Sequence, residues 1–266
     1  LHLQARDTPR AVPDASRLAE GRIGYWSFDG HAKSLPDQGT LTGRLLGDAR
    51  FEDSPFGKGV WLGGYGDGVA IPPSDALNVG DGDFTVATWI NPRELVRGGI
   101  LGRGQHNSAH GWYLEMPNNQ GLLRLEAFGP DNRRAGVVSS PPGILRGGEW
   151  QHVAAVVQRG KGETRLFVNG WPVATGSIGA VNLDNPQLGM LIGRVEEGQT
   201  LQGDIDEVHF YRRALDEGEL QALVDRGRQF VTRQPPEKTR EITLQLVAQR
   251  RQRADVLAQR VKFDLE

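Results

Sequence analysis

The sequence contains no cysteine among its 266 residues. Disulfide bonds, thiol catalysis and cysteine-based zinc or iron–sulfur sites are therefore excluded, although the absence does not fix the cellular compartment. Long apolar runs are missing as well. A stretch such as residues 153–157 is far too short to cross a bilayer, which takes about 20 apolar residues. We therefore expect no membrane span.

A strong excess of charge of either sign is also lacking, because the net charge is only −2. The chain as a whole has no general attraction to nucleic acid or anionic lipid, so we expect no nucleic-acid partner. The charge is unevenly distributed. The residues after Asp225 include ten Lys or Arg against five Asp or Glu, a net +5, which leaves −7 on the first 225 residues. The two parts therefore have different surfaces.

Glycine is abundant, with 36 residues, and this indicates many tight turns. Residues 1–20 are polar and read as a connector. From residue 21 to residue 213, short apolar runs alternate with glycine, proline and asparagine, the pattern of an antiparallel sandwich. We predict strands near 22–28, 57–63, 67–72, 83–91, 98–103, 111–116, 121–128, 134–139, 150–158, 164–169, 172–177, 188–194 and 200–211.

Two local signals are specific. Asn169-Gly170 lies between two strand-like runs and suits the two positive-φ positions of a type I′ hairpin turn. After the last predicted strand, residues 214–224 change to helical spacing, and Asp216 is placed to cap that helix. We therefore predict a hairpin at residues 165–174 and a short helix after the sandwich.

The C-terminal part is separated from the rest by Gln234-Pro235-Pro236. Residues 237–262 predict a second helix, whose apolar stripe is interrupted by Arg250. Two readings stay open: a solvated linker, or a helix that docks on other domains or on a partner. Because the chain begins with Leu1, we expect it to be a piece of a longer protein.

Five ordered motifs resemble a known family. They are residues 24–30 (GYWSFDG), 82–92 (GDFTVATWINP), 149–154 (EWQHVA), 166–170 (LFVNG) and 203–208 (GDIDEV). In order and spacing they resemble the laminin G-like, concanavalin A-like jelly-roll domains of bacterial modular proteins, over about residues 21–226.

The resemblance implies an all-β fold of two antiparallel sheets packed face to face, with the first and last strands adjacent, as in legume lectins, pentraxins and related glucanases. We therefore divide the chain into a connector (1–20), a jelly-roll domain (21–226) and a charged helical tail (227–266). The resemblance also implies an extracytoplasmic location.

Large apolar residues on the predicted strands have the core as their default role, and burying each contributes about 1.5–3 kcal/mol. They include Trp26, Phe28, Trp89 and Phe210. His152 lies in such a strand, and we expect it to be a hydrogen-bonded structural histidine.

Aromatic side chains are also the candidates for binding a sugar. Trp112 and Tyr113 are neighbours on one strand and point to opposite faces, so one of them is a candidate platform, with a core role for both as the alternative. Tyr65 and Trp171 are further candidate ligand-binding residues.

Asp204, Asp206 and Glu207 lie within four positions, and such carboxylates are not tolerated in a sandwich interior unless a cation or hydrogen-bond donors neutralise them. Ile205 and Val208 break strict alternation, since their positions differ by an odd number. A β-bulge near Asp206 would restore the alternation.

Calcium takes six to eight oxygen ligands, and glycine-rich turns supply carbonyl groups. The resemblance places a structural calcium ion where the first and last strands meet, with Asp29 and Asp206 as ligands and Asp67 as a weaker candidate. The alternative is that Asp29 and Asp67 are turn residues bonded to backbone amides, and that Asp206 and Glu207 pair with Arg22 or Arg194.

An enzyme is the competing function. Glucanases of this fold use paired carboxylates, but here Val208 replaces the third acid of their alternating pattern. The sequence also lacks a Ser-His-Asp order, a phosphate loop and a His-Glu-x-x-His motif. We expect a non-catalytic binding or interaction module, with a glycan or a cell-surface protein as its partner; a glycoside hydrolase and a purely structural spacer are the alternatives.

Overall fold

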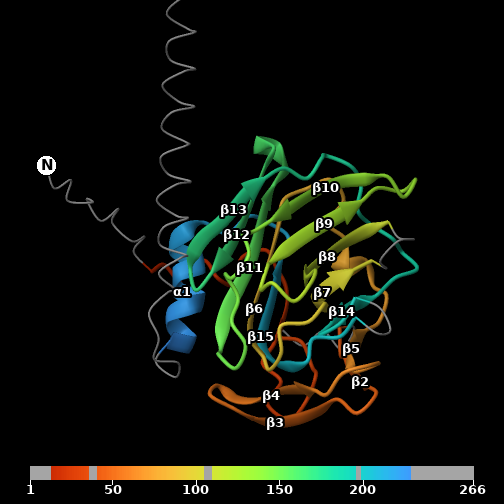
Figure 1. The fold of residues 1–266 in the computed structure, drawn as a ribbon. Coiled ribbons are helices and arrows are strands. Elements are labelled where there is room, and N and C mark those ends of the chain that lie inside the picture. The colour runs from red at the N-terminus through yellow and green to blue at the C-terminus, as the bar shows by residue number, and fades with distance from the viewer. Residues whose placement is uncertain (1–12, 36–40, 105–109, 196–198, 229–266) are drawn as a thin grey trace, which may run out of the picture.

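The computed structural model describes residues 13–35, 41–104, 110–195 and 199–228. It shows two antiparallel sheets packed face to face, with one short α-helix on the outer side of the larger sheet (Figure 1). The predicted all-β sandwich is therefore confirmed. The predicted tail helix at residues 237–262 lies outside the described residues, and within them no helix is long and apolar enough to span a membrane.

The larger sheet has eight strands. In spatial order they are β13 (Trp171–Gly176), β12 (Glu163–Val168), β11 (Gln151–Gln158), β6 (Phe84–Pro92), β15 (Gly203–Tyr211), β4 (Gly57–Leu62) and β3 (Arg50–Ser54), with β1 (Arg22–Trp26) also paired to β15.

The smaller sheet has seven strands. They are β10 (Arg134–Ser139), β9 (Arg124–Phe128), β8 (Gly111–Met116), β7 (Gly98–Arg103), β14 (Met190–Ile192), β5 (Gly68–Ile71) and β2 (Arg44–Leu46). Two 3₁₀ turns, η1 (Asp75–Leu77) and η2 (Arg159–Lys161), and helix α1 (Glu217–Arg228) complete the described elements.

The main core fills the space between the sheets. Trp26, Phe84, Trp112 and Phe210 are fully buried there, and the Trp112 ring lies 5.1 Å from Phe84 and 5.4 Å from Phe210 between ring centroids. These residues alternate along their strands with residues that face outward, as expected for a two-sheet core.

A second apolar cluster lies beneath α1, on the outer face of the larger sheet. Leu220 and Leu223 of the helix pack with Phe167, Ala154 and other residues of that face. The helix begins with a reciprocal cap: the Glu219 N–H donates to the Asp216 carboxylate and the Asp216 N–H donates to the Glu219 carboxylate. The predicted capping role of Asp216 is thus confirmed.

The last strand, β15, joins the two ends of the domain. Its first part pairs with β4 and its last part pairs with β1, so β1 and β4 lie one after the other along the same edge of β15. The register shifts between Asp206 and His209, and Glu207 has a φ of 52°. The predicted bulge is confirmed, and it lies where the β4 pairing ends and the β1 pairing begins.

The hairpin prediction is also confirmed: Asn169 and Gly170, between β12 and β13, have φ values of 52° and 79°, the two positive values that a type I′ turn requires. Strands β2 and β3 were not predicted from the sequence. Their residues are exposed or only partly buried, so they do not show the alternation on which the prediction depends.

Candidate functional site

Two of the predicted calcium ligands lie on either side of the β3–β4 turn. Asp29, which follows β1, accepts a hydrogen bond from the Lys58 N–H at 3.1 Å. Asp206 accepts one from the Ser54 hydroxyl at 2.5 Å and another from the Glu207 N–H at 2.7 Å. The bulge in β15 thus turns Asp206 toward the same hairpin that Asp29 contacts.

Asp206 has no exposed surface. Its pKa is raised to about 8, mainly because of burial and also because of the nearby Glu207 and Asp29 carboxylates, against the opposing effect of the hydrogen bonds from Ser54 and the Glu207 N–H. Burial also raises the pKa of Glu207, whose carboxylate accepts a 2.8 Å bond from the Tyr25 hydroxyl. Asp29, Asp206 and Glu207 therefore lie close enough around the bulge for the charge of one to disfavour ionisation of another.

Asp67 belongs to a different place. Its buried carboxylate accepts hydrogen bonds from the N–H groups of Asp48, Gly63 and Gly64 at 2.6–3.2 Å. Asp29 contacts Lys58 at the start of β4, whereas Gly63 follows its end, and five residues of strand span about 17 Å. Asp67 therefore does not share an ion with Asp29, and its role is the alternative one, a turn residue bonded to backbone amides.

Among the described residues, no three His, Asp or Glu side chains are grouped as ligands of one metal ion. The chemistry around Asp206 nevertheless fits a hard cation: burial, and to a smaller extent the neighbouring carboxylates, raise the pKa values of Asp206 and Glu207, and a divalent ion would favour the charged form of both. Calcium at this position stays a prediction, with Asp29 and Asp206 as its side-chain ligands.

The three predicted aromatic residues do not form one platform. Trp112 is fully buried in the core and presents no face to a ligand, as in the core alternative. Tyr65 is 77% exposed and follows β4, whereas Trp171 is half-buried and begins β13. Five strand spacings separate β13 from β4, about 24 Å. Tyr65 and Trp171 therefore cannot stack on the same small sugar.

His152 is buried, as expected, but its ring is not hydrogen-bonded within the part of the chain that the structure describes. Only its backbone is bonded, since its N–H donates to the Asn169 side chain. Burial lowers the pKa of His152 to about 3, with Arg228 adding to the effect. His209 nearby, stacked on Tyr25 with 4.5 Å between ring centroids, has its pKa lowered by the same cause. Both rings are therefore neutral at pH 7.

A recess not predicted from the sequence lies at one edge of the smaller sheet, on its outer face. We call it the sheet-edge pocket; its volume is about 560 Å³. It is lined by Thr42 and Arg44, residues 70–73, Gly104 and residues 187–191.

The floor of the sheet-edge pocket is a row of paired residues. Ala70 pairs with Arg44 on one side and Leu191 on the other, and Leu191 pairs with Gly102 of β7. Ala70 and Leu191 are half-buried, while their sequence neighbours point into the main core. The floor is therefore apolar, and the exposed residue Arg44 lies beside it.

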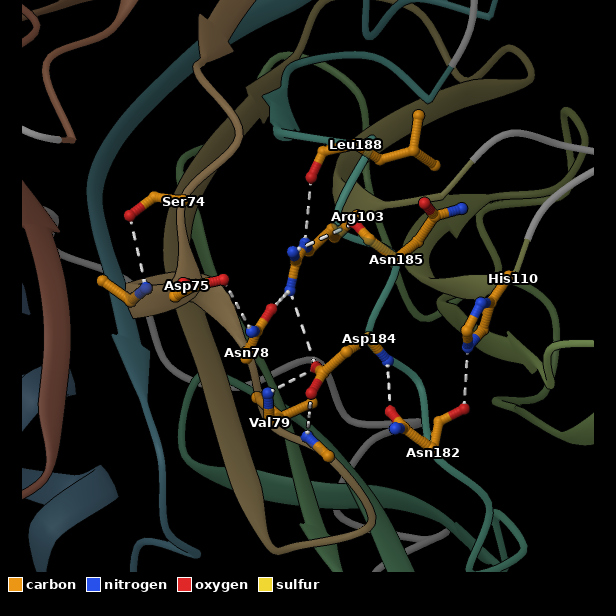
Figure 2. A network of polar contacts seen from close by, with 12 residues as sticks. Ser74, Asp75, Asn78, Val79, Arg103, His110, Asn182, Asp184, Asn185 and Leu188 are labelled. Carbon is orange, nitrogen blue, oxygen red and sulfur yellow. Dashed lines mark hydrogen bonds and ion pairs between the residues drawn. The ribbon is translucent and has the colours of Figure 1, made fainter.

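A buried arginine fixes the wall of the sheet-edge pocket, and Figure 2 shows the polar contacts of this arginine. Arg103, only 1% exposed, donates to the carbonyl groups of Leu188 and Asn185 at 3.1 Å each, and to the Asn78 side chain at 2.7 Å. It also lies 3.6 Å from the Asp184 carboxylate. The planar guanidinium thus ties the segment before β14 to the segment around η1.

The same network continues on both sides. The Asp184 carboxylate accepts hydrogen bonds from the N–H groups of Val79 and Gly80 at 2.7 and 3.0 Å, and the Asp184 N–H donates to the Asn182 side chain (Figure 2). Gly189 lies so close to β5 that an added Cβ would overlap the Ile71 carbonyl oxygen. The wall of the sheet-edge pocket is therefore preorganised rather than loose.

The rest of the smaller sheet's outer face is occupied by side chains that form ion pairs and hydrogen bonds with one another. Glu115 pairs with Arg124, and Glu126 accepts a 3.1 Å bond from the Tyr113 hydroxyl. Glu115 and Glu126 are both almost completely buried. These groups stabilise the sheet and leave the recess at the edge.

The sequence signal for this site was weak. The pocket residues come from four separate segments, and many contribute only backbone or a small side chain. In the sequence, Arg103 is a charged residue at the end of a predicted strand and Pro72-Pro73 is typical of a loop, and neither pattern indicates a pocket. The one unusual feature is that Arg103, a charged residue, directly follows the apolar residues of β7, and all six positions of that strand are buried.

The fold and this site define the class of protein: an antiparallel β-sandwich with a preformed recess on one sheet. Residues 62–221 match the laminin G-like model of the concanavalin A-like lectin/glucanases superfamily, so the chain belongs to that family. No curated protein sequence matches the chain.

Solved structures agree on the fold. The binding domain of paraclostridial mosquitocidal protein 1 is 17% identical with a TM-score of 0.64; the match covers 79% of this chain and 53% of that one, about half its length. Domain 4 of AbnA, a GH43 extracellular arabinanase from Geobacillus stearothermophilus, was solved with arabinotriose. It is 18% identical with a TM-score of 0.60, and the match covers 76% of this chain and 98% of that one. A Trypanosoma rangeli sialidase is 18% identical with a TM-score of 0.57, and the match covers 84% of this chain and 34% of that one. At these identities the likeness shows the fold alone.

Proposed function

We propose that the chain is a non-catalytic, carbohydrate-binding module of a larger extracytoplasmic protein, and that the ligand occupies the sheet-edge pocket. The observation that carries the proposal is the wall fixed by Arg103. A recess of about 560 Å³ with an apolar floor and a few polar groups at its rim is typical of small-ligand sites.

The neighbours support the choice of carbohydrate. The AbnA domain, whose whole length is matched, was solved with arabinotriose, and the mosquitocidal protein contributes a binding domain. Thr42 and Gln187 lie at exposed positions of the pocket wall and offer a hydroxyl and an amide to sugar hydroxyl groups.

A test uses two substitutions to methionine on the same sheet. Ala70 and Val137 both face outward, but Ala70 lies in the pocket floor and Val137 lies on β10, 42% exposed. We expect Ala70→Met to abolish binding on a glycan array and in calorimetry, and Val137→Met to leave it unchanged. Equal binding by both variants would place the ligand elsewhere.

The non-catalytic part of the proposal rests on the paired acids. Asp206 has no exposed surface, and the neighbouring Asp204 accepts a 3.1 Å bond from the Asn91 side chain. Asp206 is therefore not presented to an open sugar site, whereas a glycosidase requires this of both its carboxylates. We expect no sugar release from β-glucans; release that disappears in Asp206→Asn would contradict this.

We also propose that one calcium ion stabilises the junction of β1, β4 and β15. Asp29 and Asp206 would hold it together with backbone carbonyl groups, and the ion would neutralise their charge. Binding to the folded state alone adds about 2.7 kcal/mol when free calcium is a hundred times Kd.

The measurement is the melting temperature of the protein with calcium or with chelator. We expect calcium to raise it for the wild type and not for Asp206→Asn. Asp53→Asn is the matched control, because Asp53 lies on the same hairpin with its side chain 92% exposed. An unchanged wild-type melting temperature would remove the calcium proposal and leave the sugar proposal intact.

A further inference from the structure

The charge of the sheet-edge pocket comes from one residue. Arg44 is the only ionisable side chain among the described residues that line it. Its guanidinium makes no hydrogen bond or ion pair with any described residue, whereas other arginines on the surface, such as Arg50 and Arg134, pair with glutamates. A cation that no described carboxylate neutralises is available to a ligand.

The surroundings of Arg44 favour the binding of a carboxylate at this position over general attraction of anions to the domain. The first 225 residues carry a net −7, so the domain has no general attraction for anions. The pocket floor beside Arg44 is apolar, formed by Ala70 and Leu191, and an apolar floor strengthens a charge-assisted bond at its rim. The planar fork of an arginine matches the two oxygens of a carboxylate.

The pocket also lacks the usual means of holding a neutral sugar. No aromatic ring belongs to the described residues that line it, so stacking does not supply the affinity there. What remains is a charge-assisted bond at Arg44, hydrogen bonds from Thr42 and Gln187, and contact of a sugar ring with the apolar floor.

We infer that the ligand of the sheet-edge pocket is an acidic saccharide, whose carboxylate binds Arg44 while its ring lies on Ala70 and Leu191. This inference rests on the proposed carbohydrate-binding function and names the class of sugar. It assigns Arg44 as the residue that determines specificity.

The experiment compares sugars that differ only in the charged group: glucose with glucuronate, and galactose with galacturonate, as sodium salts at matched ionic strength. Each is titrated into the full chain by calorimetry at millimolar concentration. We expect each acid to bind at least tenfold more tightly than its neutral partner. In Arg44→Gln this preference should disappear, and Arg44→Lys should keep part of it.

Arg133→Gln is the control, since Arg133 is 87% exposed on a turn far along the sheet and pairs with Asp131. It should keep the wild-type preference. A preference that survives in Arg44→Gln overturns the role of Arg44. Sodium acetate that displaces glucuronate with equal affinity shows a general anion site and overturns the saccharide class.

The two proposals fail in different ways. Equal affinity for acid and neutral sugars, lost in Ala70→Met, overturns the acidic-sugar inference and leaves the proposed function standing. Binding of none of the four sugars by the wild type, with an array that shows no glycan sensitive to Ala70→Met, overturns both.

Discussion

The outer faces of the two sheets are used in different ways. On the larger sheet, α1 covers the face, and Trp89, His152 and His209 are buried beneath or beside it. On the smaller sheet no described helix covers the face, internal ion pairs close one half, and a recess remains at the edge (Figure 1). The comparison teaches that one face has become a second core while the other keeps an open recess.

The largest expected effect on the free energy of unfolding comes from comparing a Leu→Ala substitution on each of the two outer faces. Leu223→Ala in α1 removes a side chain that is only 3% exposed, and we expect a loss of about 2–5 kcal/mol in the free energy of unfolding. Leu191→Ala in the half-buried pocket floor should cost about 1 kcal/mol or less. Denaturant midpoints measure both, and equal losses would break the comparison.

Arg103→Leu should give the next largest effect. The change removes three hydrogen bonds from a buried guanidinium, and we expect a loss of about 2–3 kcal/mol in unfolding free energy together with loss of ligand binding. Arg103→Lys keeps the charge but not the fork and should recover only part of either. Binding that is normal in Arg103→Leu would show that the pocket wall needs no such support.

The buried histidine gives a pH dependence confined to the covered face. His152 has a folded pKa of about 3, below the unfolded value near 6.5, so the unfolded state binds more protons in acid. Its contribution is fully present above pH 6.5 and is lost as the pH falls toward 3. Between pH 7.5 and pH 5 this amounts to about 2 kcal/mol for one histidine.

Asp206 acts in the opposite direction, because its folded pKa of about 8 lies above the unfolded value, so its contribution is present in acid and is lost as the pH rises through 8. The comparison of wild type with His152→Gln removes this effect, since both proteins keep Asp206. We expect the stability of the wild type, relative to His152→Gln, to fall by about 2 kcal/mol from pH 7.5 to pH 5. A constant difference would contradict the buried neutral ring.

The smallest expected effect concerns Tyr65. Its ring is 77% exposed in the turn after β4, away from the sheet-edge pocket, so Tyr65→Ser should change the free energy of unfolding by less than about 0.5 kcal/mol. Sugar affinity should change less than twofold, in contrast to Ala70→Met. A large loss of affinity in Tyr65→Ser would move the ligand site to the β4–β5 turn.

Local sequence determined much of this fold because each signal acts over a few residues. The positive-φ pair Asn169-Gly170, the cap at Asp216 and the broken alternation around Asp206 each predicted a feature that the structure contains. Alternation also predicted most strands, but it could not find β2 and β3, whose side chains are largely exposed.

Only the tertiary structure decided which buried or exposed positions act together. The sequence placed Asp29, Asp67 and Asp206 in one candidate set, but Asp67 lies at the other end of β4. It gave no sign that Arg103 joins residues 78, 185 and 188, or that Arg44 lies beside Ala70 without a polar partner among the described residues. The physical reason is that a pocket is formed by strand pairing between distant segments, whereas alternation and turn chemistry report only what each residue does with its immediate neighbours.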